Sequence, residues 1–74
     1  MGHRLITEIY EHENQVELLY GCDTWEEAVR IHGIATDLGY KCYPSQAALV
    51  RHESKFVRII TTDTKDQVIL KLAL

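Results

Sequence analysis

The chain has 74 residues, of which 46% are hydrophobic and 26% are charged, and its formal net charge is −3. This length suits one domain with one core, and the composition is that of a globular chain rather than a disordered one. The acidic balance argues against binding nucleic acid by broad neutralisation of phosphates, and no apolar run approaches the ~20 residues of a membrane span. Because the N-terminal residues also lack the apolar stretch of a signal peptide, we expect residues 1–74 to form one cytoplasmic domain.

The first part of the chain predicts a β-hairpin. After a frayed end at residues 1–4, residues 5–10 alternate in the manner of a strand and carry apolar side chains on both faces. The polar residues 12–15 then predict a loop. Residues 16–20 resume the alternation, which indicates a second strand.

Residues 24–38 predict an amphipathic helix. Thr24 and Glu27 have the spacing of a capping box at its start, and Gly39 is a favourable residue just after its end. One wide apolar face contains Trp25, Ala28, Val29, Ile31, Ala35 and Leu38. Such a wide stripe predicts cover on more than one side, from a curved sheet or from a second chain.

Three other positions of this helix bear on its surroundings. Glu26 and Arg30 are spaced as an i,i+4 ion pair on the polar side. Gly33 lies in mid-helix, where glycine is either tolerated or marks the close approach of another backbone. His32 falls inside the apolar stripe, so we expect it to be packed with one ring nitrogen bonded to backbone or water, or to make a pH-dependent contact.

The segment after the helix is less clear. Residues 41–43 predict a short strand that is stopped by Pro44 and therefore lies at, or ends at, a sheet edge. In residues 45–53, Gln, Ala and Leu favour a helix that Ser45 can cap, whereas alternation of Ala48 and Val50 suits a strand. We favour the strand, because a hairpin would lead the chain into the next segment.

The last third of the chain predicts two more strands. Residues 56–62 alternate clearly, residues 62–66 form a polar loop, and residues 67–74 alternate again up to the last leucine. The predicted fold is a small α+β domain: ββα followed by about three strands, with one helix packed on an antiparallel or mixed sheet.

The sequence contains no motif that fixes a reaction, a cofactor or a family. The four histidines, His3, His12, His32 and His52, show no metal-ligand spacing. Cys22 and Cys42 could approach His52 only if their strands were neighbours, and we expect both cysteines to be reduced, half-buried thiols. No glycine-rich loop cradles a phosphate or places a nucleophile. We therefore predict no enzyme activity, no cofactor and no metal.

One pair of carboxylates also invites a catalytic interpretation. Glu8 and Glu17 could face each other across the first hairpin. Two carboxylates on exposed strands normally form a solvated surface, and we interpret them in that way.

The apolar end of the chain gives the main functional indication. A strand over residues 67–74 left at an open edge would pair with another chain, because Lys71 is its only charge. Together with the wide helical stripe, this favours a homodimer. The predicted interface consists of Val68, Leu70, Leu72, Leu74, Trp25 and His32.

We therefore predict a small non-enzymatic protein-binding or adaptor domain that acts as a homodimer. The alternative is a small nucleic-acid-associated regulator, in which bases would stack on tyrosines. That alternative requires one exposed face to gather Tyr43 with the basic residues Lys41, Arg51, Lys55 and Arg58.

Overall fold

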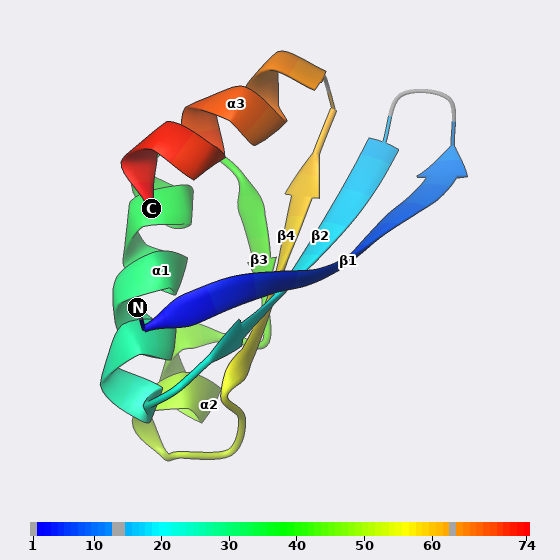
Figure 1. Ribbon diagram of the computed structural model, residues 1–74. Helices are drawn as coiled ribbons and strands as arrows, with labels where there is room; N and C mark the ends of the chain where they lie inside the picture. The colour runs from blue at the N-terminus through cyan, green and yellow to red at the C-terminus, as the bar shows by residue number, and fades with distance from the viewer. Residues whose placement is uncertain (1, 13–14, 63) are drawn as a thin grey trace.

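The computed structural model describes residues 2–12, 15–62 and 64–74, which form an α+β fold with a four-stranded antiparallel sheet and three helices (Figure 1). The strands are β1 (His3–His12), β2 (Gln15–Cys22), β3 (Lys41–Tyr43) and β4 (Phe56–Thr61), and the helices are α1 (Trp25–Asp37), α2 (Gln46–Val50) and α3 (Thr64–Ala73). The sheet order is β1-β2-β4-β3, which confirms the α+β class and the edge position of residues 41–43. Residues 13 and 14 of the predicted first loop lie outside the described residues.

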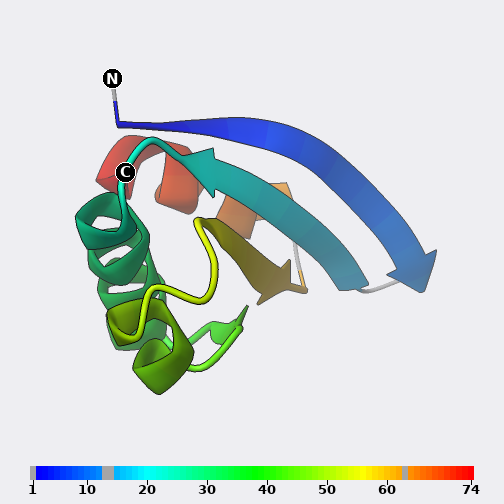
Figure 2. The same ribbon diagram turned by 90° about the horizontal axis from the view of Figure 1, so that it is seen from below.

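The helices pack against one side of the twisted sheet (Figures 1 and 2). Side chains from all three helices and from the two central strands enter a single buried cluster. Its members are Val16, Leu18, Tyr20, Cys22, Ala28, Ile31, Ala35, Leu49, Val57, Ile59 and Leu70. The other side of the sheet receives no described helix.

Helix α1 is confirmed together with both of its end signals. Thr24 Oγ1 accepts a hydrogen bond from the Glu27 N–H over 3.2 Å. Gly39 adopts φ +94°, a left-handed conformation that glycine takes without a Cβ clash, and the Tyr40 N–H donates to the Ala35 carbonyl over 3.0 Å. This pattern is a Schellman motif, which ends the helix.

Most of the wide apolar stripe of α1 is covered within the same chain, and Leu38 at its end is 43% exposed. The helix contacts β2, β3 and β4 on one side and α2 on another, so this cover comes from more than one side of the same chain. His32 is buried, and its Nδ1 lies 3.4 Å from Thr36 Oγ1, as in a packed histidine. No described atom lies within 4 Å of a Cβ built on Gly33, which identifies tolerance rather than close approach.

Residues 2–4 are ordered, and the expectation that they fray is wrong. The Gly2 carbonyl accepts a hydrogen bond from the Asp23 N–H over 2.9 Å, and β1 begins at His3. His3 Nδ1 lies 2.7 Å from Glu27 Oε2. These contacts join the start of β1 to the start of α1.

The predicted strand in residues 45–53 is wrong, because this segment contains helix α2. Ser45 caps the helix by accepting a hydrogen bond from the Ala48 N–H over 3.2 Å. The helix-favouring residues Gln46 to Val50 therefore determine the local structure, and the alternation is incidental.

The predicted C-terminal strand is also wrong, because residues 64–73 form helix α3. Among residues 65–73 of this helix, only Leu70 is completely buried, whereas Leu72 is 83% exposed. Asp66 near the start of α3 and Lys71 near its end suit the helix dipole. With this segment helical, β4 pairs with β2 and β3, and the predicted hairpin of residues 56–62 with 67–74 does not form.

Candidate protein-binding surface

The side of the sheet opposite the helices carries a broad apolar surface. Residues that pair across antiparallel strands face the same way, so the register defines three rows on this side. The apolar residues on this side are the row members Ile9, Leu19, Tyr43, Phe56 and Ile60 and the unpaired Ile6, which lies against Gly21. We call these six residues, together with Glu17 and Arg58, the open sheet face.

The apolar side chains of the open sheet face remain accessible to solvent. Ile6, Ile9, Tyr43 and Phe56 are between 40% and 49% exposed. Leu19 and Ile60 are half-buried between the outer strands. A contiguous apolar surface of this kind is typical of a binding site.

Because Gly21 has no side chain, Ile6 and Phe56 can pack over it. A Cβ built on Gly21 would lie 2.7 Å from Ile6 Cδ1 and 3.6 Å from Phe56 Cε1. Ile6 occupies the bulge in β1, where the pairing shifts between Leu5 and Thr7. The bulge and the glycine together make one end of the open sheet face continuous.

An ion pair lies in the middle of this apolar surface. Glu17 of β2 accepts hydrogen bonds from Arg58 of β4, and the Arg58 guanidinium also lies 5.9 Å from the centre of the Tyr43 ring. The Glu17 side chain is 6% exposed, whereas that of Arg58 is 54% exposed. The carboxylate is thus covered and the guanidinium partly faces solvent.

The structure does not bring the six predicted interface residues together on one surface. Leu70 and His32 are buried, and Leu74 packs against the core. Val68 and Leu72 are exposed on the outside of α3. Trp25 lies instead at the start of α1. Four of the six predicted residues, at positions 68, 70, 72 and 74, were assigned to a strand that does not form.

Trp25 lines a shallow groove between α1 and α2. The groove has a volume of about 280 Å³ and is lined by Trp25, Glu26, Val29, Leu49, Val50 and His52. The His52 ring stacks on the Trp25 ring with centroids 4.6 Å apart, and Lys55 Nζ lies 4.3 Å from the Trp25 ring centre. These contacts hold the indole in place.

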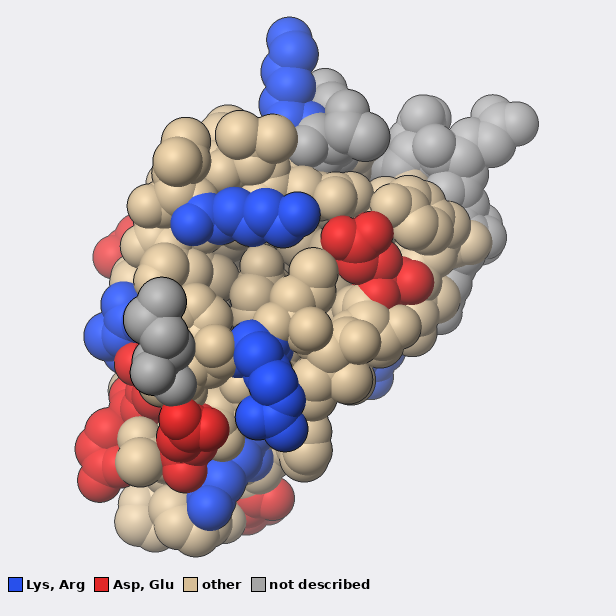
Figure 3. All heavy atoms as spheres, in the orientation of Figure 1, with Lys and Arg blue, Asp and Glu red and all other residues tan. Residues whose placement is uncertain are grey.

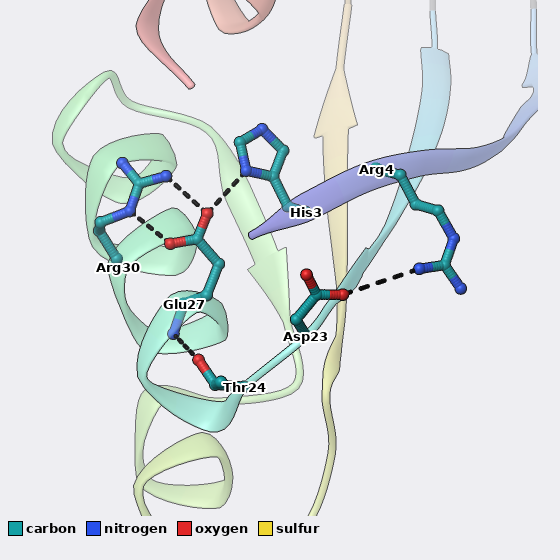
Figure 4. A network of polar contacts seen from close by, with 6 residues as sticks. All are labelled: His3, Arg4, Asp23, Thr24, Glu27 and Arg30. Carbon is teal, nitrogen blue, oxygen red and sulfur yellow. Dashed lines mark hydrogen bonds and ion pairs between the residues drawn. The ribbon is translucent and has the colours of Figure 1, made fainter. Parts of the chain in front are cut away.

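Figure 4 shows a polar network at the start of α1. The Glu27 carboxylate accepts two hydrogen bonds of 2.7 Å from Arg30 and also contacts His3. Arg30 therefore pairs with Glu27. The sequence predicted Glu26 as its partner instead. The Arg30 hydrogen bonds, followed by that of His3, lower the pKa of Glu27 from 4.5 to about 2. This network joins β1 to α1.

The basic residues that a nucleic-acid surface would need lie apart. Arg58 and Lys41 are on the open sheet face or its margin, whereas Lys55 lies over Trp25 and Arg51 pairs with Glu53. On the side of the molecule in Figure 3, basic and acidic side chains are interspersed among uncharged ones. The clustering with Tyr43 that the nucleic-acid alternative requires is therefore absent from the part of the chain that the structure describes.

Groups that could carry catalysis are also dispersed. Glu8 pairs with Leu18 and accepts a hydrogen bond from Tyr10, so it lies on the opposite side of the sheet from Glu17. Across residues 2–12, 15–62 and 64–74, no three His, Cys, Asp or Glu side chains are grouped as metal ligands. Cys22 and Cys42 are free thiols, and burial raises the pKa of both.

No protein-family model matches the chain, and no curated protein or solved structure is significantly similar to it. Within the described residues, none of the helices has the length and apolar character needed to cross a membrane. The function must therefore be inferred from the surfaces themselves.

The sequence contains a signal for the open sheet face. Residues 5–10 carry apolar side chains on both sides of the strand, and Phe56 and Ile60 alternate with the buried Val57 and Ile59 in β4. A strand that covers a core with one side needs apolar residues on that side only. Here the helices cover only one side of the sheet. Strands with apolar residues on both sides therefore indicate a second apolar surface.

Proposed function

We propose that this chain is a small non-enzymatic protein-binding domain that acts as a homodimer, with the open sheet face as the contact between two copies. The observation that supports it best is the exposure of four large apolar side chains, each at least 40% exposed, on one continuous sheet surface. The largest apolar patch on a monomeric protein is often functional.

A second copy is the partner that the charges favour. The contact between two copies related by a twofold axis uses the same surface of each copy, so that surface must be self-complementary. Glu17 and Arg58 neutralise each other at the centre of the open sheet face, and Lys41 lies beside Ile60 at its margin. The centre of the face is therefore neutral toward a second copy, whereas Arg4 and Lys41 lie at its edges.

The size of the surface predicts a weak dimer. With a strand spacing of ~4.8 Å and a rise of ~3.3 Å per residue, three strands over six residues and β3 over its three residues span roughly 330 Å² of flat area on each copy. Interfaces that bury less than about 1,200 Å² in total belong to weak or transient complexes. We therefore expect a reversible homodimer with a micromolar or weaker dissociation constant.

Sedimentation equilibrium of the wild type and two charge variants tests the homodimer. Phe56→Lys places a charge on the open sheet face and should weaken self-association by at least about tenfold, because an unpaired charge is then buried in the contact. Leu72→Lys is the matched control, because Leu72 is also a large exposed apolar residue but lies on α3. The control should associate like the wild type.

A wild type that stays monomeric at millimolar concentration would rule out the homodimer. If Leu72→Lys weakens association and Phe56→Lys does not, the contact lies on α3 instead. The nucleic-acid alternative predicts that the monomer is retained by random oligonucleotides at low salt and released as salt rises.

A further inference from the structure

The solvent-facing charges in the three rows on the open side of the sheet are basic, although the net charge of the whole chain is −3. They belong to Arg4, Arg58 and Lys41. The Arg4 and Arg58 side chains are 71% and 54% exposed, whereas the acid of these rows, Glu17, is 6% exposed. A partner that approaches this side of the sheet therefore meets apolar side chains and positive charge.

Arg58 keeps donor groups for a partner while it is bonded to Glu17. Its Nε and Nη2 atoms contact Glu17 Oε1, and a guanidinium carries five N–H groups in all. Because the Arg58 side chain is more than half exposed, its remaining N–H groups can donate to a carboxylate from another protein. The Glu17 carboxylate takes no part in that contact.

Arg4 and Lys41 lie at opposite corners of the open sheet face. Arg4 is on the outer strand β1 in the row of Phe56, and Lys41 is on the outer strand β3 in the row of Ile60. With ~4.8 Å between strands and ~3.3 Å per residue, these corners are roughly 20 Å apart. Arg4 also lies 4.0 Å from Asp23, beyond the end of β2, but both side chains are more than half exposed and such a pair is weak.

The flat side of a sheet offers side chains to a partner, because the strands use their backbone groups within the sheet. An extended segment laid on this side would bury its own backbone N–H and C=O groups without partners, which costs free energy. A helix bonds these groups within itself, and about 13 helical residues span the 20 Å between the corners. Helices already cover the other side of the same sheet (Figure 2). A helix is therefore the occupant that suits this side best.

We propose that the open sheet face binds an amphipathic helix of another protein, in which acidic residues flank an apolar stripe. The stripe packs on Leu19, Phe56 and Ile60, and Arg58 donates to an acid in the middle of the helix. Acids near its two ends pair with Arg4 and Lys41. This inference rests on the open sheet face being a protein-binding surface, as proposed above, and not on self-association.

The acidic helix and a second copy would compete for the same surface. A second copy brings the same neutral centre and the same basic edges, whereas the helix brings opposite charge to both edges. We therefore expect the helix to bind more tightly than a second copy and to dissociate the weak homodimer.

Titration of the isotope-labelled protein with synthetic peptides, followed by NMR, tests the helix. The acidic peptide has about 18 residues, because shorter isolated helices are marginal in water. Leucines form one helical stripe, glutamates lie on both sides of it, and alanines fill the other positions. A basic counterpart carries lysine in place of every glutamate, and a broken counterpart carries two prolines in place of alanines.

We expect the acidic peptide to shift the amide signals of Leu19, Phe56 and Ile60. Its dissociation constant should be at least about tenfold lower than those of both counterparts, because the lysines repel the basic edges and the prolines break the helix. Equal binding by the basic peptide would overturn the charge preference. Equal binding by the broken peptide would show an extended occupant and overturn the helix.

Two charge reversals locate the contact. Lys41→Glu lies at the edge of the open sheet face and should weaken binding of the acidic peptide by about fivefold or more. Lys71→Glu is the matched control, because Lys71 is also exposed and the net charge changes equally, but it lies on α3. The control should bind like the wild type, and equal effects of the two reversals would overturn the placement of the helix.

The outcomes separate this inference from the homodimer. A monomeric wild type that binds the acidic peptide supports the helix and overturns the homodimer. A dimer that the acidic peptide leaves intact supports the homodimer and overturns the helix. A monomeric wild type that does not bind the peptide overturns both.

Discussion

Glu27 joins three parts of the molecule through one carboxylate. It belongs to the cap of α1, binds Arg30 one turn along, and contacts His3 at the start of β1 (Figure 4). The carboxylate also lies at the positive end of the helix dipole. A residue with this many favourable contacts in its charged form links stability to pH.

The low pKa of Glu27 predicts acid sensitivity with a definite sign. Since the pKa is about 2 in the folded protein and 4.5 ordinarily, its stabilising contribution is complete above pH 4.5 and is lost as the pH falls toward 2. Glu27→Gln removes this titration. We expect the melting temperature of the variant to fall less steeply than that of the wild type between pH 4.5 and 2. Equal slopes would show that the network contributes nothing.

Two glycines associated with α1 should respond oppositely to the same substitution. Gly33→Ala should raise the free energy of unfolding by roughly 0.5–1 kcal/mol, because glycine is a poor helix former and open space surrounds the position. Gly39→Ala should lower it by about 1 kcal/mol, because φ is +94° there. Urea denaturation measures both, and effects of the same sign would contradict the Schellman ending of α1.

At the level of elements, α3 shows where a sequence pattern is ambiguous. Leucines at positions 70, 72 and 74 alternate like a strand, yet Leu70 and Leu74 are also one helical turn apart. In the structure these two residues meet the core and Leu72 points outward. Alternation over so few residues cannot distinguish the two periods, and tertiary packing decides.

Alanine substitutions at two leucines distinguish the helix from the predicted strand. Leu70→Ala should cost about 2–5 kcal/mol, because Leu70 is fully buried. Leu72→Ala should change stability by less than about 0.5 kcal/mol, because Leu72 is 83% exposed. In a strand, positions 70 and 72 would share one side and respond alike. Chemical denaturation measures the difference.

Local signals identified other elements correctly. Thr24, Glu27 and Gly39 fix both ends of α1, because caps and a left-handed glycine act within a few residues. Pro44 likewise indicates the edge position of β3. For α2, Ser45 is a cap signal in the sequence, whereas the strand prediction depends on a hairpin that does not form. Expectations about distant pairing were thus less reliable than local chemistry.

At the scale of the whole molecule, the two sides of the sheet differ. Three helices pack on one side and form the core with it, and the other side is the open sheet face. The interface predicted from the sequence lies mainly on the C-terminal segment, whereas the open sheet face lies on the four strands. The ion pair between Glu17 and Arg58 depends on β2 and β4 being neighbours, and no pattern in one sequence gives that neighbour relation.

The different burial of Cys22 and Cys42 predicts that their thiols react at different rates. Cys22 is buried in the core, and burial, with Glu27 and Asp23 nearby, raises its pKa to about 11. Its reaction with a thiol reagent at pH 7 should therefore require unfolding, whereas Cys42 is partly accessible. We expect Cys42 to react first, and Cys22 at a rate that rises with urea as the unfolded fraction does. Fast labelling of Cys22 in water would contradict this burial.

The chain has a single tryptophan, and its position has a spectroscopic consequence. Trp25 stacks on His52 and lies under Lys55 between α1 and α2, on the helical side of the sheet. Its fluorescence therefore senses whether these two helices are together, while the open sheet face contains no indole. Light emission and molecular mass report on two different events, so folding and self-association can be followed separately in one unlabelled sample.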